Sequence, residues 1–581
     1  MLFHYPTLSL ENATPATGVN APSRPASRKN LWGCFCLLAG LWLTGCASLP
    51  SEVERPVSTA LASSADTPLG KAVVARAAAA GTRNDSAFAL VSSAELAFTS
   101  RMALIEAAQK TLDLQYYAIH FDDTTQRMFA ALRDAAKRGV RVRILLDDFN
   151  TAGSNAQVLK IAFESNIELR LFNPLPTGRA SPLIRIIGSL SNAAQLQRRM
   201  HNKVFVADNA IAITGGRNLG ETYFGQSEGT NFVDIDVLAA GRIARDLSHS
   251  FDQYWNNPLA YPVESLMTAQ DIDALKRQPS NPSPEGQSAS PENPATVVEA
   301  ARSSAQGSNT APADGATRSL PAVPDLPTLP ASTDLRLLTW TWAPSVMLVD
   351  KPSKIAADAD SVEEAQDSAV DGLLQVMAQA QTDLLIVSPY FVPGAPMMKQ
   401  FADIRKRGVR VRVLTNSLAS NDAPAAHAGY ARYRKALLDL GVELYEMRAE
   451  QPGSVFNFGS ARGSSGSAGG ASRASLHAKV VVMDARLLVV GSMNLDLRSQ
   501  LQNSEVAVVI RSPQLALEAT RLIEPSLASG AYRVALVNGQ QLVWHAPQGL
   551  SLPDTDVEPD ASLGLRLLVQ LIAPFAPDEM L

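Results

Sequence analysis

Two histidines, far apart in the chain, each open the same pattern of residues. HNKVFVAD at residues 201–208 is followed by GGRN at 215–218, and HAKVVVMD at 477–484 is followed by GSMN at 491–494. The residues after each His-x-Lys are strand formers, so the histidine and the lysine two positions later should point to the same face of a strand. A neutral imidazole beside an ammonium group suits attack on an anionic electrophile. Because the spacing is identical in the two copies, it favours a chemical role over chance.

The aspartate and asparagine of each pattern have less certain roles. Asp208 and Asp484 fall where the strand must turn. Such residues serve as turn formers as often as they orient a site, and both interpretations stay open. Asn218 and Asn494 follow a second strand and a glycine turn, so their amides can return to the face that carries the histidine and the lysine.

The elements that position these residues also repeat. KRGVRVRIL at residues 137–145 recurs as KRGVRVRVL at 406–414, and each copy follows a helical pattern. Each glycine stands where a helix should stop, and the alternating residues after it predict a strand. Another strand precedes each helix, at 112–117 and 384–388. This alternation predicts an α/β sheet covered by helices. We interpret the repeated arginines as a solvated strand edge.

The paired motifs resemble the phospholipase D superfamily, from about residue 93 to about residue 510. The segments LDLQYY at 112–117, RRM at 198–200 and RNLG at 217–220 resemble its bacterial cardiolipin synthases, and within them the branch that joins phosphatidylglycerol to phosphatidylethanolamine. The resemblance implies two pseudo-twofold-related phospholipase D-like α/β/α sandwich domains, with the active site at their interface.

The resemblance also implies a mechanism. One histidine attacks phosphorus to form a phosphohistidine, and the other protonates the leaving alcohol and then deprotonates the acceptor. The habit of the superfamily makes His201 the nucleophile and His477 the acid and base. We expect the phosphate oxygens to be bound by the lysines and by Asn218 and Asn494. The residues expected to be catalytic are His201, Lys203, Asp208, His477, Lys479 and Asp484.

A carboxylate behind each imidazole would hold it in one tautomer. Glu505 fits this position for His477 in the second half. In the first half Asp234 and Asp236 are candidates for His201, and we prefer Asp234 on alignment. The sequence carries no array with metal-ligand spacing, so we expect neither a metal nor a cofactor.

The N-terminus predicts export. Arg28 and Lys29 precede an apolar run that ends in LTGC at residues 43–46. This ending resembles a bacterial lipoprotein signal, in which Cys46 would be lipidated; a plain signal peptide or an uncleaved anchor is the alternative. No aspartate follows the cysteine, so the resemblance favours a lipoprotein on the periplasmic side of the outer membrane.

Composition divides the 581 residues into segments. Stretches rich in Pro, Ser and Ala bury too little apolar surface to fold, whereas the flanking patterned stretches predict domains. The C-terminal stretch contains an apolar segment that either lies on a membrane or packs on the body. The predicted segments are a lipoprotein-type signal peptide (1–45), a tether (46–80), a first phospholipase D-like domain (81–262), a disordered insert (263–333), a second such domain (334–545) and a tail with a possible interfacial helix (546–581).

These features together favour a phosphatidyltransferase that makes cardiolipin from phosphatidylglycerol and a second phospholipid, for which phosphatidylethanolamine is the candidate. A phospholipase D that releases phosphatidic acid is the alternative; a nuclease or other phosphodiesterase, and then an anchored scaffold, follow. The net charge of −5 counts against a nucleic-acid partner. We expect phospholipids and a membrane surface as partners, and the sequence leaves the oligomeric state open.

Overall fold

The computed structural model describes residues 49–82, 85–175, 193–227, 229–277, 332–356, 368–451, 472–575 and 577–578. They belong to one compact unit, Leu49–Leu581. The predicted signal peptide, Cys46 and residues 278–331 of the predicted insert lie outside the described residues.

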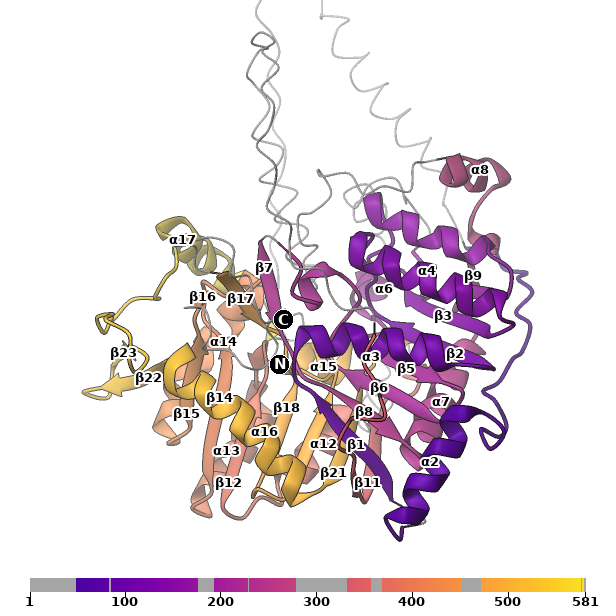
Figure 1. Ribbon diagram of the computed structural model, residues 1–581. Helices are drawn as coiled ribbons and strands as arrows, with labels where there is room; N and C mark the ends of the chain where they lie inside the picture. Colours follow the sequence, from indigo (N-terminus) through magenta and orange to yellow (C-terminus); the bar gives the residue numbers. More distant parts are fainter. Residues whose placement is uncertain are drawn as a thin grey trace, which may run out of the picture. The chain divides into compact units, whose positions relative to one another are not determined.

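The described residues form two nine-stranded sheets (Figure 1), in which eight strands follow the same order and the ninth is added at opposite edges. In each, three adjacent parallel strands have an antiparallel neighbour on both sides. The first sheet has the order β10 (Thr341–Ala343), β1 (Ser86–Val91), β8 (Asp236–Ala240), β6 (Ile211–Gly215), β5 (Val204–Ala207), β2 (Thr111–Tyr116), β3 (Arg141–Asp147), β4 (Ile167–Phe172) and β9 (Ala260–Pro262). The second has the order β11 (Ser345–Val349), β21 (Val506–Arg511), β19 (Leu487–Gly491), β18 (Val480–Met483), β12 (Asp383–Val387), β14 (Arg410–Asn416), β15 (Glu443–Met447), β22 (Ala531–Val537) and β23 (Gln541–His545).

Helices cover these sheets, as the alternating pattern predicts (Figure 1). Those of the first half are α2 (Pro68–Ala79), α3 (Ala94–Ala107), α4 (Asp123–Lys137), α6 (Ala193–Gln197), α7 (Arg242–Trp255) and α8 (Ala269–Arg277), with short helices η1 (Gly153–Phe163), η3 (Glu221–Tyr223) and η4 (Val263–Leu266). Those of the second half are α10 (Ser353–Ala356), α12 (Ala369–Met377), α13 (Gly394–Lys406), α14 (Pro424–Asp439), α15 (Leu497–Leu501), α16 (Pro513–Pro525) and α17 (Leu563–Ile572), with η6 (Ser526–Gly530) and η7 (Ala573–Phe575).

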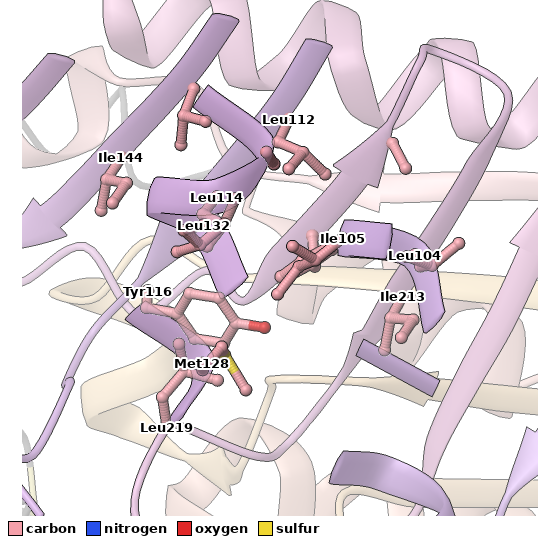
Figure 2. Close-up of a cluster of buried hydrophobic side chains, with 14 of the residues drawn as sticks. Leu104, Ile105, Leu112, Leu114, Tyr116, Met128, Leu132, Ile144, Ile213 and Leu219 are labelled. Atoms are coloured by element: carbon pink, nitrogen blue, oxygen red, sulfur yellow. The ribbon is translucent and has the colours of Figure 1, made fainter. Parts of the chain in front are cut away.

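The core of the first half lies between its sheet and the helices α3 and α4. Figure 2 shows Leu112 and Leu114 of β2 packed with Leu132 of α4 and Ile105 of α3, all fully buried. Burial of such side chains stabilises the contact by about 1.5–3 kcal/mol each. A separate core combines strands of both halves, with Val237 of β8 and Val508 of β21 among its buried members. The two halves therefore share buried apolar surface.

The interpretation of the repeated arginines as a solvated strand edge fits Arg410, whose side chain is 53% exposed, but it is wrong for the second arginine of each strand. Arg143 is fully buried and pairs with Asp113 at 2.7 Å and with Asp252 at 2.8 Å. Arg412 in the second half pairs in the same way with Asp383 and Glu524. Each carboxylate neutralises a charge that would be costly to bury alone, so these arginines are structural.

Much of the predicted tether is folded onto the first half. Its backbone carbonyls accept hydrogen bonds from buried arginines, as Ser58 does from Arg143 at 2.9 Å and Pro56 from Arg170 at 2.6 Å. Residues 68–79 form helix α2, which begins at the N-cap Thr67. The tether prediction is therefore wrong for the described residues from 49 onward, because hydrogen bonds hold a segment that lacks an apolar pattern.

The boundaries of the predicted insert also need correction. Residues 263–277 form η4 and α8, and both Val263 and Leu275 are buried in the first core. On the far side of the insert, β10 joins the edge of the first sheet by pairing with β1. The second sheet begins only at β11, so the first half takes its edge strand from beyond the insert.

Two small sheets complete the fold. One joins the halves: β17 (Ser472–Leu476) pairs in parallel with β7 (Thr230–Val233), and β16 (Glu450–Gln451) pairs with β17. The other consists of β13 (Phe391–Val392) and β20 (Leu495–Asp496). Among the helices described, none has both the length and the apolar character needed to cross a bilayer.

Candidate active site

Each motif histidine lies beside a segment of the opposite half. The backbone N–H of His477 donates to the carbonyl of Val233 at 2.8 Å, at the end of the β7–β17 pairing. The backbone N–H of His201 donates to the carbonyl of Ser504 at 2.9 Å, next to a parallel bridge between Met200 and Ser504. In each case a motif histidine of one half bonds to a backbone carbonyl of the other half. Both histidines therefore lie where the halves meet.

The carboxylates that hold the imidazoles are crossed between the halves. Nδ1 of His201 lies 3.0 Å from both carboxylate oxygens of Glu505, and Nδ1 of His477 lies 2.6 Å from Oδ2 of Asp234. The sequence singles out these two carboxylates, but the predicted pairing of Glu505 with His477 and of Asp234 with His201 is wrong. The alternative, Asp236, pairs with Arg101 and Arg217 instead. Each imidazole thus depends on a carboxylate from the other half.

Both carboxylates are held in the charged form. Burial opposes the charge of Asp234, but the hydrogen bond and charge of His477, with the nearby charges of Arg217 and Lys479, outweigh burial and lower the pKa of Asp234. Burial likewise opposes the charge of Glu505, and the charge and hydrogen bond of His201 lower its pKa on balance. A charged carboxylate on Nδ1 fixes the proton there and leaves Nε2 for chemistry.

A glycine and a serine at matching positions support the two carboxylates. Ser492 donates its hydroxyl to Oε2 of Glu505 at 2.5 Å. The matching Gly216 lies so close to Asp234 that an added Cβ would stand 2.5 Å from Oδ2. The Gly-Gly and Gly-Ser of the two motifs are therefore fitted to the shorter aspartate and the longer glutamate.

The lysines reach back toward their own histidines. Both are buried, and Nζ of Lys203 donates to the carbonyl of His201 at 2.9 Å. Nζ of Lys479 lies 2.7 Å from the carbonyl of His477 and 3.0 Å from its Nε2. This ammonium therefore stands beside the nitrogen that Asp234 leaves open, where an anionic group would be neutralised.

The two asparagines are held differently. Asn218 accepts from the N–H of Ala118 at 3.2 Å and donates to the hydroxyl of Tyr223 at 3.1 Å. Asn494 is 4% exposed, and its Oδ1 accepts no hydrogen bond from the described residues. Both asparagines follow the second strand of their motif, but their hydrogen-bond partners differ, so the two halves are not symmetric at this point.

The two motif aspartates form turns. Asp208 and Asp484 have φ values of 50° and 52°, and each accepts hydrogen bonds from the backbone N–H groups of three consecutive residues, 109–111 and 381–383. They stand at the far end of the strand from each histidine. The prediction that Asp208 and Asp484 are catalytic is therefore wrong. Of the two roles that the sequence left open, they have the geometry of turn residues.

Aromatic side chains that the sequence analysis missed enclose the imidazoles. The ring of Tyr117 meets His201 edge-on at 5.1 Å between centroids, and Nζ of Lys203 lies 5.5 Å from the centre of that ring. Tyr223 and Phe232 pack against His477 at 5.3 and 5.1 Å. Tyr117 directly follows β2, and Tyr223 stands five residues after Asn218; this closeness to the motif elements is the signal that could have identified them.

Comparison with known proteins connects this geometry to a family. The family described as "Cardiolipin synthase, PLD-like domain" matches residues 102–255 and 373–525, one copy in each half. The chain is 34% identical to cardiolipin synthase C of Escherichia coli, over 84% of this chain and 94% of that protein. It is 30% identical to an uncharacterized protein of Helicobacter pylori, over 84% of this chain and 88% of that one.

A solved structure shares the fold. The phosphatidylserine synthase of Haemophilus influenzae aligns over 87% of this chain and 98% of its own, with a TM-score of 0.50 at 14% identity. The matches in both halves and the similarity along most of the chain agree with the duplicated motifs. The chain belongs to the phospholipase D superfamily, and within it to the family of cardiolipin synthase-like enzymes.

Proposed function

We propose that this enzyme makes cardiolipin by transferring a phosphatidyl group from one phospholipid to the glycerol headgroup of phosphatidylglycerol. The donor is a second phosphatidylglycerol or phosphatidylethanolamine. The observation that carries the proposal is the pair of imidazoles, each fixed through Nδ1 by a carboxylate of the other half. Such a pair supplies one neutral and one protonated imidazole to a single phosphate.

The proposed reaction proceeds in two displacements. Nε2 of His201 attacks phosphorus, the bond from phosphorus to the headgroup oxygen breaks, and His477 gives its Nε2 proton to that oxygen. The acceptor hydroxyl then loses its proton to His477 and attacks phosphorus, and the bond to His201 breaks. Lys203 and Lys479 would neutralise the charge on the non-bridging oxygens. The second step restores both imidazoles.

Lipid analysis tests the proposal. Purified protein incubated with phosphatidylglycerol, with and without phosphatidylethanolamine, should form cardiolipin and release glycerol or ethanolamine. His201→Ala and His477→Ala should each abolish the product. Wild-type yield from either variant would overturn the mechanism, and phosphatidic acid in place of cardiolipin would identify a hydrolase.

We also propose that helix α17 rests on the membrane that holds the substrate. One side of the helix packs on the body, with Val569 buried against Leu418 and Ala449. The other side exposes a line of leucines, Leu563, Leu567 and Leu571, at 67%, 56% and 68%. Both interpretations of this segment left open by its sequence therefore agree with the geometry.

The position of α17 supports this role. Its contacts Leu418 and Ala419 follow β14, whose last residue, Asn416, exchanges two hydrogen bonds with Leu476, directly before His477. Helix α17 therefore packs near the C-terminal end of β14 and beside Ala449, which directly precedes β16 (Figure 1). Replacing the three exposed leucines with serine should weaken sedimentation with phosphatidylglycerol vesicles; unchanged sedimentation would contradict the proposal.

A periplasmic location, with Cys46 carrying the lipid anchor in the outer membrane, remains part of the proposal. It rests on the N-terminal sequence, which lies outside the described residues. Palmitate labelling of the wild type that is lost in Cys46→Ser would support it, and labelling that persists would contradict it.

A further inference from the structure

The two halves stop matching just after the site asparagines. Asn218 is followed by LGETY at residues 219–223, and Asn494 is followed by LDLRS at residues 495–499. Tyr223 therefore corresponds to a serine in the second half, and Arg498 corresponds to a threonine in the first. A duplicated scaffold that departs from symmetry beside its site can treat its two substrates differently.

The first half supplies an uncharged wall beside His477. The ring of Tyr223 stacks on Phe232 at 4.8 Å and meets His477 at an angle of 79°. Its hydroxyl accepts the hydrogen bond from Asn218. The symmetry break on this side therefore adds aromatic surface and holds a site residue in place.

The second half supplies a cation on the side of His201. Arg498, on α15, is 6% exposed, and its Nη2 donates to the carbonyl of Gln197 in the first half at 3.3 Å. Its charge interacts with Tyr117, the residue whose ring packs against His201. Arg498 therefore reaches across to the segment of the first half that leads into the proposed nucleophile, His201.

Burial and charges of both signs act on Arg498. Burial and the neighbouring charge of Arg199 disfavour its charged form, against the opposing effects of Tyr117 and Asp496, and the pKa of Arg498 falls on balance. Burial, with the charge of Glu505, raises the pKa of Asp496 to about 6, so this carboxylate is still mostly charged at pH 7. Because burial disfavours the charged guanidinium, an anion bound beside Arg498 would stabilise that charge.

We propose that Arg498 binds a second anionic group beside His201, the phosphate of the acceptor phospholipid. The inference rests on the proposed function. The motif histidines and lysines serve the phosphate that is transferred, whereas the acceptor phosphatidylglycerol carries a phosphate of its own. In the product only a glycerol bridge separates the two phosphates, so the second must lie near the first. A guanidinium group suits a phosphodiester because it donates two parallel hydrogen bonds.

Acceptor competition tests the inference. Vesicles would contain phosphatidylglycerol and an equal amount of monoacylglycerol, which offers similar hydroxyls without a phosphate. Mass spectrometry would follow cardiolipin, the acyl-phosphatidylglycerol formed from monoacylglycerol, and phosphatidic acid formed from water. The wild type should prefer the acceptor that bears a phosphate. In Arg498→Gln the ratio of cardiolipin to the other two products should fall roughly 10- to 100-fold, as for a lost hydrogen bond between charged groups.

Arg434→Gln is the matched control. Arg434 is a buried arginine, 2% exposed, that pairs with Glu446 and Glu558 within the second half. Its loss should lower the melting temperature and leave the product ratio unchanged. Ratios are insensitive to the fraction of folded enzyme. If Arg498→Gln does not accumulate, Arg498→Lys should give an intermediate ratio.

The outcomes separate the two proposals. A wild type that makes no cardiolipin overturns the proposed function and this inference together. A wild type that makes cardiolipin but shows no preference between the acceptors overturns the inference alone. The same holds if Arg498→Gln, or Arg498→Lys where that variant is used, keeps the wild-type ratio.

Discussion

Neutralising each carboxylate should impair the histidine of the opposite half. Glu505→Gln and Asp234→Asn keep the shape of the side chain and remove its charge. Opposite charges in hydrogen-bonding contact stabilise each other by about 1.4–4 kcal/mol. The contacts measure 3.0 and 2.6 Å between buried groups, so solvent does not weaken them appreciably. Each variant should therefore lose roughly 10- to 1000-fold in rate.

An activated donor shows which histidine each carboxylate serves. In a phosphatidyl ester of p-nitrophenol the leaving group needs no proton. An enzyme that lacks the general-acid histidine should still release p-nitrophenol, whereas one that lacks the nucleophilic histidine should not. The burst of p-nitrophenol would be compared with the rate on phosphatidylglycerol. Crossed pairing predicts that Asp234→Asn behaves like His477→Ala and Glu505→Gln like His201→Ala. This holds whichever histidine is the nucleophile.

A nearby buried aspartate serves as the control. Asp236 pairs with Arg101 and Arg217, so Asp236→Asn should lower stability and affect both donors equally. If Glu505→Gln follows His477→Ala instead, or if both carboxylate variants respond to the activated donor in the same way, the crossed pairing is refuted.

The remaining predictions concern the residues that support the site. Gly216→Ala should abolish transfer, because its Cβ would stand 2.5 Å from Oδ2 of Asp234, and retained activity would contradict this. Asp208→Asn should cost about 1–2 kcal/mol in urea unfolding, because its buried charge accepts backbone hydrogen bonds. Asp484→Asn should cost less, because that carboxylate is more exposed. Burial opposes the charge of Asp484, but backbone hydrogen bonds lower its pKa on balance, so its stabilisation should be complete above about pH 4 and lost as the pH falls further. If the difference in unfolding free energy between the wild type and Asp484→Asn does not shrink in acid, this prediction is contradicted.

The sequence predicts the two sheets and the candidate residues because both depend on local patterns. Strand formers follow His201 and His477, and the repeat at 137–145 and 406–414 marks matching strands in the two sheets. Spacing within one half also indicates Asp234 as a candidate carboxylate. Signals of this kind are carried by residues that are close in the chain.

The crossed pairing and the folded tether depend on contacts between distant residues. Spacing within a half cannot show that Glu505 faces His201, because the contact follows from the way the halves pair at Met200 and Ser504. Residues 53–62 carry no apolar period, and they are held by hydrogen bonds such as that from Arg143 to Ser58. Such contacts leave no periodic signal in the sequence.

A crystal structure with orthovanadate, which adopts the five-coordinate geometry of phosphorus during transfer, tests the shared site most directly. One vanadate should be bonded to Nε2 of one motif histidine, with Nε2 of the other on its opposite side. Lys203 and Lys479 should contact its equatorial oxygens. Two separate vanadate ions, or imidazoles that face away from a common ion, would contradict a single site built by both halves.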